Sequence, residues 1–251
     1  MVRRVAVCAV LVSVAMAVAY AAGGVWETKP FTEWTDKDIQ QVLTDSPWAG
    51  KGSLTNVSSG GRFMPVPDWK ITVVWQSALP VKQAIVRQAA GAGAITADQQ
   101  KTLGTTEETY IIRIVGLPGM YANMATATQI GNTAELLRDG KPPIKANQGG
   151  AQMLDKDGHV VEPPAGRGGA PAGAPPAAAG TGRRAGGAGG AGFGGAAAND
   201  GTTALLVFGF PKTDPITSAD KEIEFSATVG PYYLKRKFKV KEMVLKGEPA
   251  L

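Results

Sequence analysis

One segment constrains the fold of this chain more than any other. Residues 163–201 contain 14 Gly, 13 Ala and 5 Pro among 39 residues. Such a composition has little apolar surface to bury, whereas ordering a backbone costs about 1–2 kcal/mol per residue. We therefore predict a disordered insertion. Its G-x-G-x-x-G spacing at Gly187, Gly189 and Gly192 follows no apolar strand, so we expect no dinucleotide or other cofactor.

The chain after the insertion, residues 202–251, has the pattern of strands separated by turns. The strand candidates are TTALLVFGF, KEIEFSATVG, PYYLKRKFKV and EMVLKG. So few strands would be marginally stable alone. We expect residues 22–162 and 202–251 to form one domain. A loop can hold such an insertion because loop-closure entropy grows only logarithmically with length.

The N-terminus is typical of a secretory signal peptide. Arg3 and Arg4 precede the 17-residue apolar run VAVCAVLVSVAMAVAYA, which ends with the A-x-A pattern of Ala19 and Ala21. We predict that residues 1–21 are cleaved off, that the protein is exported to the periplasm or the cell exterior, and that no transmembrane span remains. The alternative is an uncleaved anchor, because roughly 17–25 apolar residues can span a bilayer.

Cysteine and charge content narrow the chemistry of the mature chain. Cys8, the only cysteine, lies in the predicted signal peptide. Disulfides, cysteine metal sites and thiol nucleophiles are therefore not expected. Without Arg3 and Arg4 the chain has 24 basic and 21 acidic residues, a net charge of +3. This balance does not favour a nucleic-acid partner.

The run FTEWTDKDIQQVLTDSPWAG predicts a helix at residues 36–44. Thr35 is placed to cap it, and Asp36 and Asp38 fall in the first turn, where the helix dipole favours carboxylates. The expected buried face consists of Ile39, Val42 and Leu43. Trp48 is the one unusual residue in this run that the helix does not explain.

The remaining patterns indicate short helices among strands. WKITVVWQ is expected to be a half-buried strand, PVKQAIVRQAA a helix, Thr96–Gly104 a capped helix, ETYIIRIVGLP a central strand, and TAELLR a strand after a short helix. Strands without long intervening helices favour antiparallel pairing. The predicted fold class is α+β: mainly antiparallel β-sheet or sandwich with a few short helices, interrupted by the disordered insertion.

Few residues are suited to catalysis. His159 is the only histidine and lies beside the insertion, where a locked catalytic geometry is not expected. Asp155 and Asp157 lack the spacing of a calcium loop. We predict neither a metal site nor specific catalytic residues. A carboxylate-dependent hydrolase stays a less favoured alternative, because the two carboxylates of a glycosidase can be far apart in sequence.

The segment KRKFKVK, residues 235–241, contains five basic residues. In a strand, alternation would place Lys235, Lys237, Lys239 and Lys241 on one face. Two interpretations stay open. The lysines form a solvated or edge-protecting face, or they form a basic stripe for an anionic envelope polymer or a membrane surface.

The runs WETKPFTEWTDKDIQQVLTDSPWAG and WQSALPVKQAIVRQ, with FPKTDPITSADKEIEFSATVGPYYLKRKFKVKEMVLKGEPAL, resemble a group of uncharacterised exported bacterial proteins. The resemblance covers most of the chain outside the signal peptide and the insertion. It implies a bacterial envelope or secreted setting and no known activity.

We therefore expect an exported, non-catalytic structural or interaction protein of the cell envelope. The alternative is a glycan-binding module that uses exposed tryptophans, with Trp48 as the leading candidate. The expected ligand or partner surface comprises Trp48, Lys235, Lys237, Lys239 and Lys241. Its partner would be an envelope glycan, an anionic polymer or another envelope protein.

Overall fold

The computed structural model describes residues 24–57, 65–105, 107–156, 158, 160–161 and 201–251. The predicted signal peptide, nearly all of the Gly/Ala/Pro insertion, and His159 lie outside these residues. Within the described ranges, no helix is long and apolar enough to cross a bilayer.

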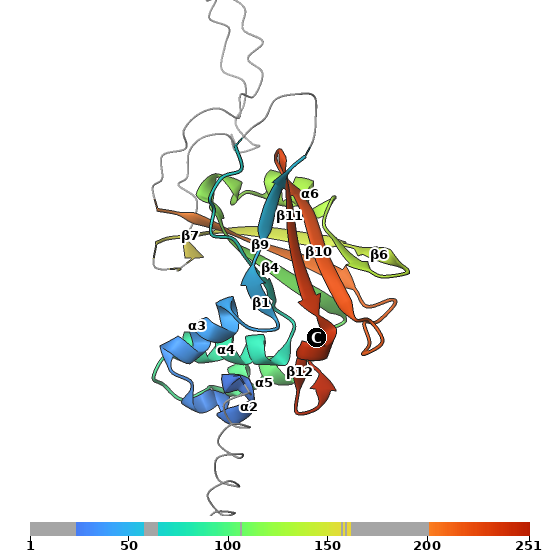
Figure 1. Cartoon of the computed structure of the whole chain (residues 1–251). Coiled ribbons are helices and arrows are strands. Elements are labelled where there is room, and N and C mark those ends of the chain that lie inside the picture. The colour runs from blue at the N-terminus through green and yellow to red at the C-terminus, as the bar shows by residue number, and fades with distance from the viewer. Residues whose placement is uncertain (1–23, 58–64, 106, 157, 159, 162–200) are drawn as a thin grey trace, which may run out of the picture.

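Two antiparallel sheets form the body of the protein (Figure 1). The six-stranded sheet runs in the order β1 (Ala49–Lys51), β3 (Thr72–Trp75), β4 (Thr109–Pro118), β9 (Thr203–Pro211), β7 (Gln148–Leu154), β8 (Val160–Val161). The five-stranded sheet runs β2 (Ser53–Asn56), β11 (Tyr232–Lys239), β10 (Glu222–Val229), β5 (Glu135–Arg138), β6 (Lys141–Lys145). The predicted fold class, α+β with mainly antiparallel sheet, is confirmed.

Short helices and turns accompany the sheets. They are α2 (Val25–Thr28), η1 (Phe31–Glu33), α3 (Asp36–Thr44), α4 (Leu79–Ala90), α5 (Ala97–Gly104), η2 (Gly119–Tyr121), α6 (Met124–Gly131) and η3 (Val240–Glu242). Figure 1 shows α2 to α5 at one end of the sheets, together with the terminal hairpin of β12 (Val244–Leu245) and β13 (Glu248–Pro249), and α6 at the other end. We call the first of these the helical end.

Strands that pass from one sheet to the other join the sheets along both margins. Only Gly52 separates β1 from β2, and a Cβ atom at Gly52 would approach the Leu234 side chain to 2.6 Å. At the other margin, the Ala146 N–H donates to Ala134 beside β5, whereas the Asn147 N–H donates to Gly209 in β9. Such sheet-switching strands make the corners of a closed sandwich.

The strands after residue 201 occupy central positions in both sheets. β9 pairs with β4 and β7, β10 pairs with β5, and β11 pairs with β2. The two flanks of the insertion lie close together, because Met153 in β7 is opposite Val161 on one side and Ala204 on the other. The two parts of the chain thus build the same pair of sheets.

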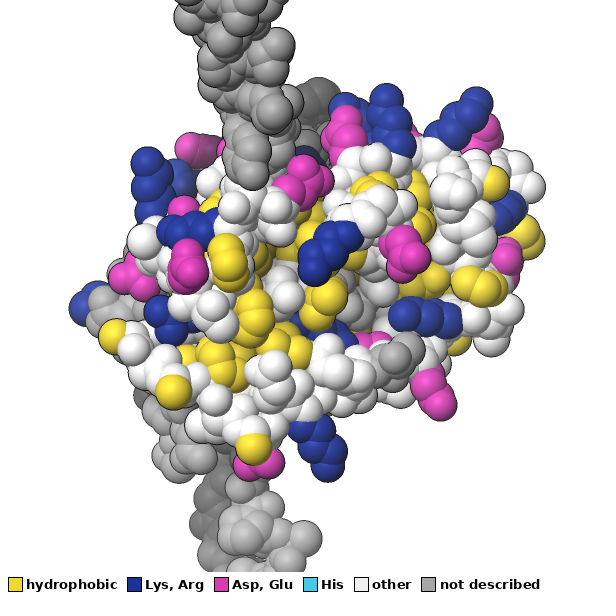
Figure 2. Space-filling view, turned by 90° about the horizontal axis from the view of Figure 1, so that it is seen from below, with side chains coloured by type: hydrophobic (Ala, Val, Ile, Leu, Met, Phe, Trp, Pro, Cys, Tyr) yellow, Lys and Arg dark blue, Asp and Glu magenta, His cyan; other side chains and the backbone are white. Residues whose placement is uncertain are grey.

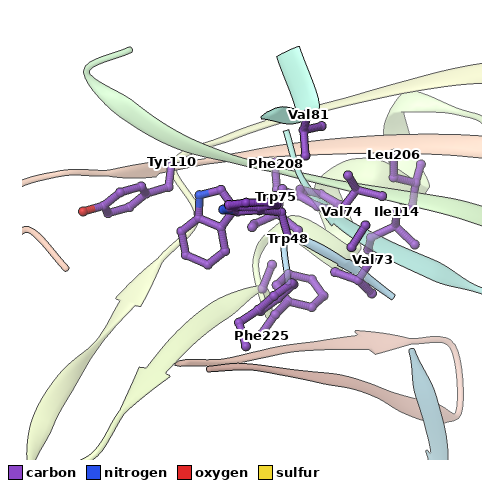
Figure 3. Packing of buried hydrophobic residues seen from close by; sticks show 14 of the residues in the cluster. Trp48, Val73, Val74, Trp75, Val81, Tyr110, Ile114, Leu206, Phe208 and Phe225 are labelled. Carbon is purple, nitrogen blue, oxygen red and sulfur yellow. The ribbon is translucent and has the colours of Figure 1, made fainter. Parts of the chain in front are cut away.

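Aromatic residues fill the space between the sheets. The ring of Phe238 lies 5.4 Å from that of Trp75, and the ring of Phe225 lies 6.3 Å from that of Phe210, both in edge-to-face geometry. These are favoured arrangements for aromatic pairs. All four side chains are fully buried. Figure 3 shows part of this core.

The predicted helix after Thr35 is confirmed, with its cap. The Thr35 Oγ1 accepts the Asp38 N–H at 3.3 Å, and the Asp38 carboxylate accepts the Thr35 N–H at 2.9 Å. Ile39, Val42 and Leu43 are buried, as expected. The α5 helix is also confirmed, with a capping box between Thr96 and Gln99.

One residue departs from the half-buried strand expected in WKITVVWQ. Ile71, Val73 and Trp75 are buried, and Lys70, Thr72 and Gln76 on the other side stay at least partly exposed, as expected. Val74, on the same side as Lys70, is buried as well, at 1% exposed. Phe238 of the five-stranded sheet packs against Trp75 of β3, and α3 packs against β1 and β3. Strict alternation fails where both faces of a strand are covered.

Candidate functional site

Trp48 does not form an exposed ligand surface, so that expectation is wrong. Its side chain is 0% exposed and lies among the buried residues of Figure 3. Its indole Nε1 donates to the carbonyl oxygen of Ala250 at 2.7 Å, and its ring meets that of Trp26 edge to face at 5.3 Å. Trp48 therefore anchors the end of the chain beside the segment that precedes α3.

A groove of about 830 Å³ opens at the helical end. One wall is the segment from Trp26 to Trp34, another is the beginning of α4, and the third is the tip of the β12–β13 hairpin. We call it the aromatic groove. Its lining residues are Trp26, Glu27, Thr28, Lys29, Pro30, Phe31, Trp34, Leu79, Gln83, Leu245, Lys246 and Glu248.

The aromatic groove combines apolar rings with polar groups of both charges. Trp26 and Phe31 are half-buried, so packing fixes their rings while part of each ring stays accessible, whereas Trp34 is buried. Glu27, Lys246 and other polar side chains share the lining. Figure 2 shows this end of the molecule, where hydrophobic side chains gather between basic and acidic ones. Apolar surface with a few polar groups is typical of small-molecule sites.

The N-terminal wall is fastened to α3. Lys29 Nζ lies 2.7 Å from the Asp38 carboxylate, and the Trp34 indole donates to the Lys29 carbonyl at 3.1 Å. The hydrogen bond from Lys29, together with that from the Thr35 backbone, lowers the pKa of Asp38 to about 2. The carboxylate that caps α3 therefore also positions the groove wall.

The C-terminal wall is a tight hairpin with an unusual tip. Lys246 and Gly247 connect β12 to β13, and both have positive φ, of 53° and 88°. Two consecutive left-handed residues define the type I′ turn, which ordinarily takes Asn-Gly. The Ala250 N–H donates to Met243 at 2.9 Å, which closes the hairpin beside Trp48. A lysine in this conformation stands on the rim of the aromatic groove.

The lysine face of β11 is only partly as expected. Lys235, Lys237 and Lys239 are exposed on one face, but the strand ends at Lys239 and Lys241 lies in η3, outside that row. The three strand lysines pair with acids: Lys235 with Glu224 at 3.0 Å, Lys237 with Glu222 at 2.7 Å, and Lys239 with Glu242 at 3.1 Å. The expected basic stripe is thus a face of mixed charge.

The first half of the β11 strand is not a free sheet edge. β11 pairs with β10 along its length and with β2 over Tyr232–Lys235. Edge protection is therefore wrong for Lys235, whereas Lys237 and Lys239 lie beyond the pairing with β2. The pairing of Lys235 and Lys237 with Glu224 and Glu222 is the usual cross-strand arrangement of opposite charges.

The structure brings together residues that the sequence did not single out. Of the sequence-predicted site residues, Trp48 lies in the core and Lys235 lies on the outer face of the sheet. The aromatic groove is instead formed by three segments that are far apart in the chain. The one signal available was the density of aromatic residues in WETKPFTEW. Across the described residues, no group of three or more His, Cys, Asp or Glu side chains is placed to hold a metal ion.

Comparisons with protein-family models, with curated proteins and with solved structures found no match for this chain.

Proposed function

We propose that this is an exported, non-catalytic binding protein of the bacterial envelope, and that it holds a glycan in the aromatic groove. A single observation supports this function: Trp26 and Phe31 present half-buried rings in an open groove whose lining also includes polar side chains such as Gln83. The apolar face of a sugar ring packs on an aromatic ring, and its hydroxyl groups need polar partners at the ring edge.

The fixed walls of the groove favour binding. Lys29 holds the N-terminal wall to Asp38, and Trp48 holds the C-terminal wall through Ala250. A site that is already ordered loses less conformational entropy when it binds, so more of the contact energy appears as affinity. The export signal predicted for residues 1–21 would bring the protein to the compartment where envelope glycans are found.

Retention on immobilised cell-wall fragments and on bacterial exopolysaccharide tests the proposed function. We expect the protein to be retained, and we expect Trp26→Ala and Phe31→Ala to be retained less. Leu79→Glu, which alters an exposed residue at the mouth of the groove without emptying the core, should also weaken retention. Circular dichroism would establish that each variant is folded.

Tyr233→Ala is the matched control. Tyr233 is an aromatic residue that is 41% exposed on the lysine face, away from the groove. Its removal should leave retention unchanged. Failure of the folded wild-type protein to bind either glycan preparation would contradict the proposed function, as would equal losses in Tyr233→Ala and Trp26→Ala.

A glycoside hydrolase is the second candidate, favoured by one observation. Glu27 and Glu248 come from opposite ends of the chain and line the same groove. Two carboxylates on either side of a glycosidic bond can act as acid and as nucleophile or base. Release of new reducing ends from a retained polysaccharide, abolished in Glu27→Gln and Glu248→Gln, would favour the hydrolase. Retention without cleavage would favour the binding protein.

A further inference from the structure

A second groove, of about 290 Å³, adjoins the aromatic groove. The two share Leu79, Leu245 and Glu248, so they meet at the tip of the hairpin. We call the second one the lysine groove. The other residues that line it are Ser77, Lys82, Leu103, Gly104, Thr105, Glu107, Lys212, Pro249, Ala250 and Leu251.

The two lysines of this groove differ in their surroundings. Lys82 Nζ donates to the Thr105 carbonyl at 2.8 Å and lies 3.1 Å from the Glu107 carboxylate, so its charge is matched. Lys212 Nζ lies 4.7 Å from the centre of the Tyr110 ring. In the part of the chain that the structure describes, no carboxylate lies within ion-pair distance of Lys212. Lys212 is thus the lysine of this groove that lacks an ion-pair partner within the described part of the chain, although Glu107 and Glu248 balance the two lysines in the lining as a whole.

The surroundings of Lys212 disfavour the charged form of its ammonium group. Partial burial lowers the pKa of the Lys212 ammonium, and the nearby Lys82 lowers it further, while Glu107 acts in the opposite direction. A negative ligand group would relieve this desolvated charge, because an opposite charge within a few ångströms favours the charged form of an ionisable group.

The loop that follows Lys212 is held in place. The Ile216 N–H donates to the Tyr110 hydroxyl oxygen at 2.7 Å. Arg138, whose side chain is 2% exposed, bonds the Asp214 carboxylate at 2.7 Å and the Asp214 carbonyl at 3.1 Å. Tyr110 therefore positions the loop with its hydroxyl and faces the ammonium with its ring. The position of Lys212 is largely set before any ligand binds.

We propose that Lys212, supported by Lys82, forms a subsite for a carboxylate, so that the glycan in the aromatic groove is an acidic one. This inference rests on the proposed function. A sugar packed on Trp26 and Phe31 would extend past Leu79 and Leu245, and the carboxylate of a neighbouring sugar would meet the Lys212 ammonium. A singly charged group fits this subsite best, because Glu107 beside Lys82 would repel a doubly charged one.

The experiment compares acidic exopolysaccharide with the same preparation after carbodiimide and borohydride treatment, which converts its carboxylates to alcohols. We expect the wild-type protein to bind the acidic form about tenfold more tightly, as for one charge-assisted hydrogen bond. Raising the salt concentration should reduce this preference. In Lys212→Gln the two forms should bind equally, and Lys212→Arg should restore the preference.

Lys235→Gln, on the outer sheet face, is the control and should keep the preference. Equal binding of acidic and reduced polysaccharide by the wild type would overturn the carboxylate subsite while leaving the glycan function standing. A preference that persists in Lys212→Gln, or tighter binding of a phosphorylated polysaccharide, would also overturn it. If the protein bound none of the preparations, both the carboxylate subsite and the proposed glycan-binding function would be overturned.

Discussion

The indole N–H of Trp48 donates to the carbonyl oxygen of Ala250 across 202 residues of sequence, at 2.7 Å. This bond joins the residue before β1 to the end of the terminal hairpin. Because Leu245 and Glu248 of this hairpin line both the aromatic groove and the lysine groove, Trp48 helps to shape both grooves although it has no exposed surface.

Replacing Trp48 by Phe is expected to lower the free energy of unfolding by about 1–3 kcal/mol, since it removes the bond and leaves the Ala250 carbonyl without its donor. Glycan affinity should fall as well, although Trp48 is buried away from the ligand. Denaturant unfolding and binding measurements check the two effects. Trp69→Phe is the control, because the Trp69 indole N–H has no hydrogen-bond partner among the described residues and its ring packs against Tyr121 at 5.5 Å. Unchanged stability in Trp48→Phe would contradict this role.

The Lys29–Asp38 pair predicts a specific dependence on pH. The pKa of Asp38 is about 2 in the folded protein, below its ordinary value of 3.8. Its stabilising contribution is therefore present above about pH 4 and is lost as the pH falls from 4 to 2. Asp38→Asn should lower the free energy of unfolding at pH 7 by about 1 kcal/mol or less.

The difference in stability between wild type and Asp38→Asn should shrink as the pH falls through this range, as measured by denaturant unfolding at each pH. Asp36→Asn is the control, because Asp36 is exposed in the same helical turn and has no bond to Lys29. A difference that stays constant down to pH 2 would show that the pair does not stabilise the fold.

Lys246, at the tip of the terminal hairpin, has a backbone conformation that is unfavourable for lysine. Lys246 has a φ of 53°, which L-residues other than Asn and Asp rarely adopt. Lys246→Asn should raise the free energy of unfolding by about 0.5–1 kcal/mol, because Asn-Gly is the preferred type I′ pair. Thermal and denaturant unfolding measure this gain. Loss of stability in Lys246→Asn would mean that the lysine side chain makes a contact that outweighs its strained backbone.

The lysine face should not bind anionic surfaces. Lys235, Lys237 and Lys239 each have an acidic partner within 3.1 Å, so little uncompensated charge faces solvent. We expect the protein to remain free of phosphatidylglycerol vesicles at physiological ionic strength, in a co-sedimentation assay. Salt-sensitive binding that disappears when all three lysines become Gln would restore the basic-stripe interpretation.

Much of the fold could be predicted because it depends on local patterns. Thr35 and Asp38 mark the start of α3 through a capping box, and the apolar run of β4 marks a central strand. The strand content after the insertion followed from alternation and from turns such as the one at Gly230, which has a φ of 58°. These signals act between residues a few positions apart.

The groove could not be predicted in this way. Phe31, Leu79 and Leu245 become neighbours only through the packing of α4 and the terminal hairpin at the helical end. The burial of Trp48 depends on an acceptor at the opposite end of the chain. The pairing of Lys237 with Glu222 depends on the register of β10 and β11. None of these relationships leaves a periodic signal in the sequence.

The location of the ligand is the most direct test of the proposed function. In a ¹H–¹⁵N NMR titration with exopolysaccharide fragments, we predict that the indole N–H signal of Trp26 shifts most. The Trp69 indole and the amide signals of Lys235 and Lys237 should stay in place. Shifts confined to the lysine face, with the Trp26 signal unmoved at saturating ligand, would contradict glycan binding in the aromatic groove.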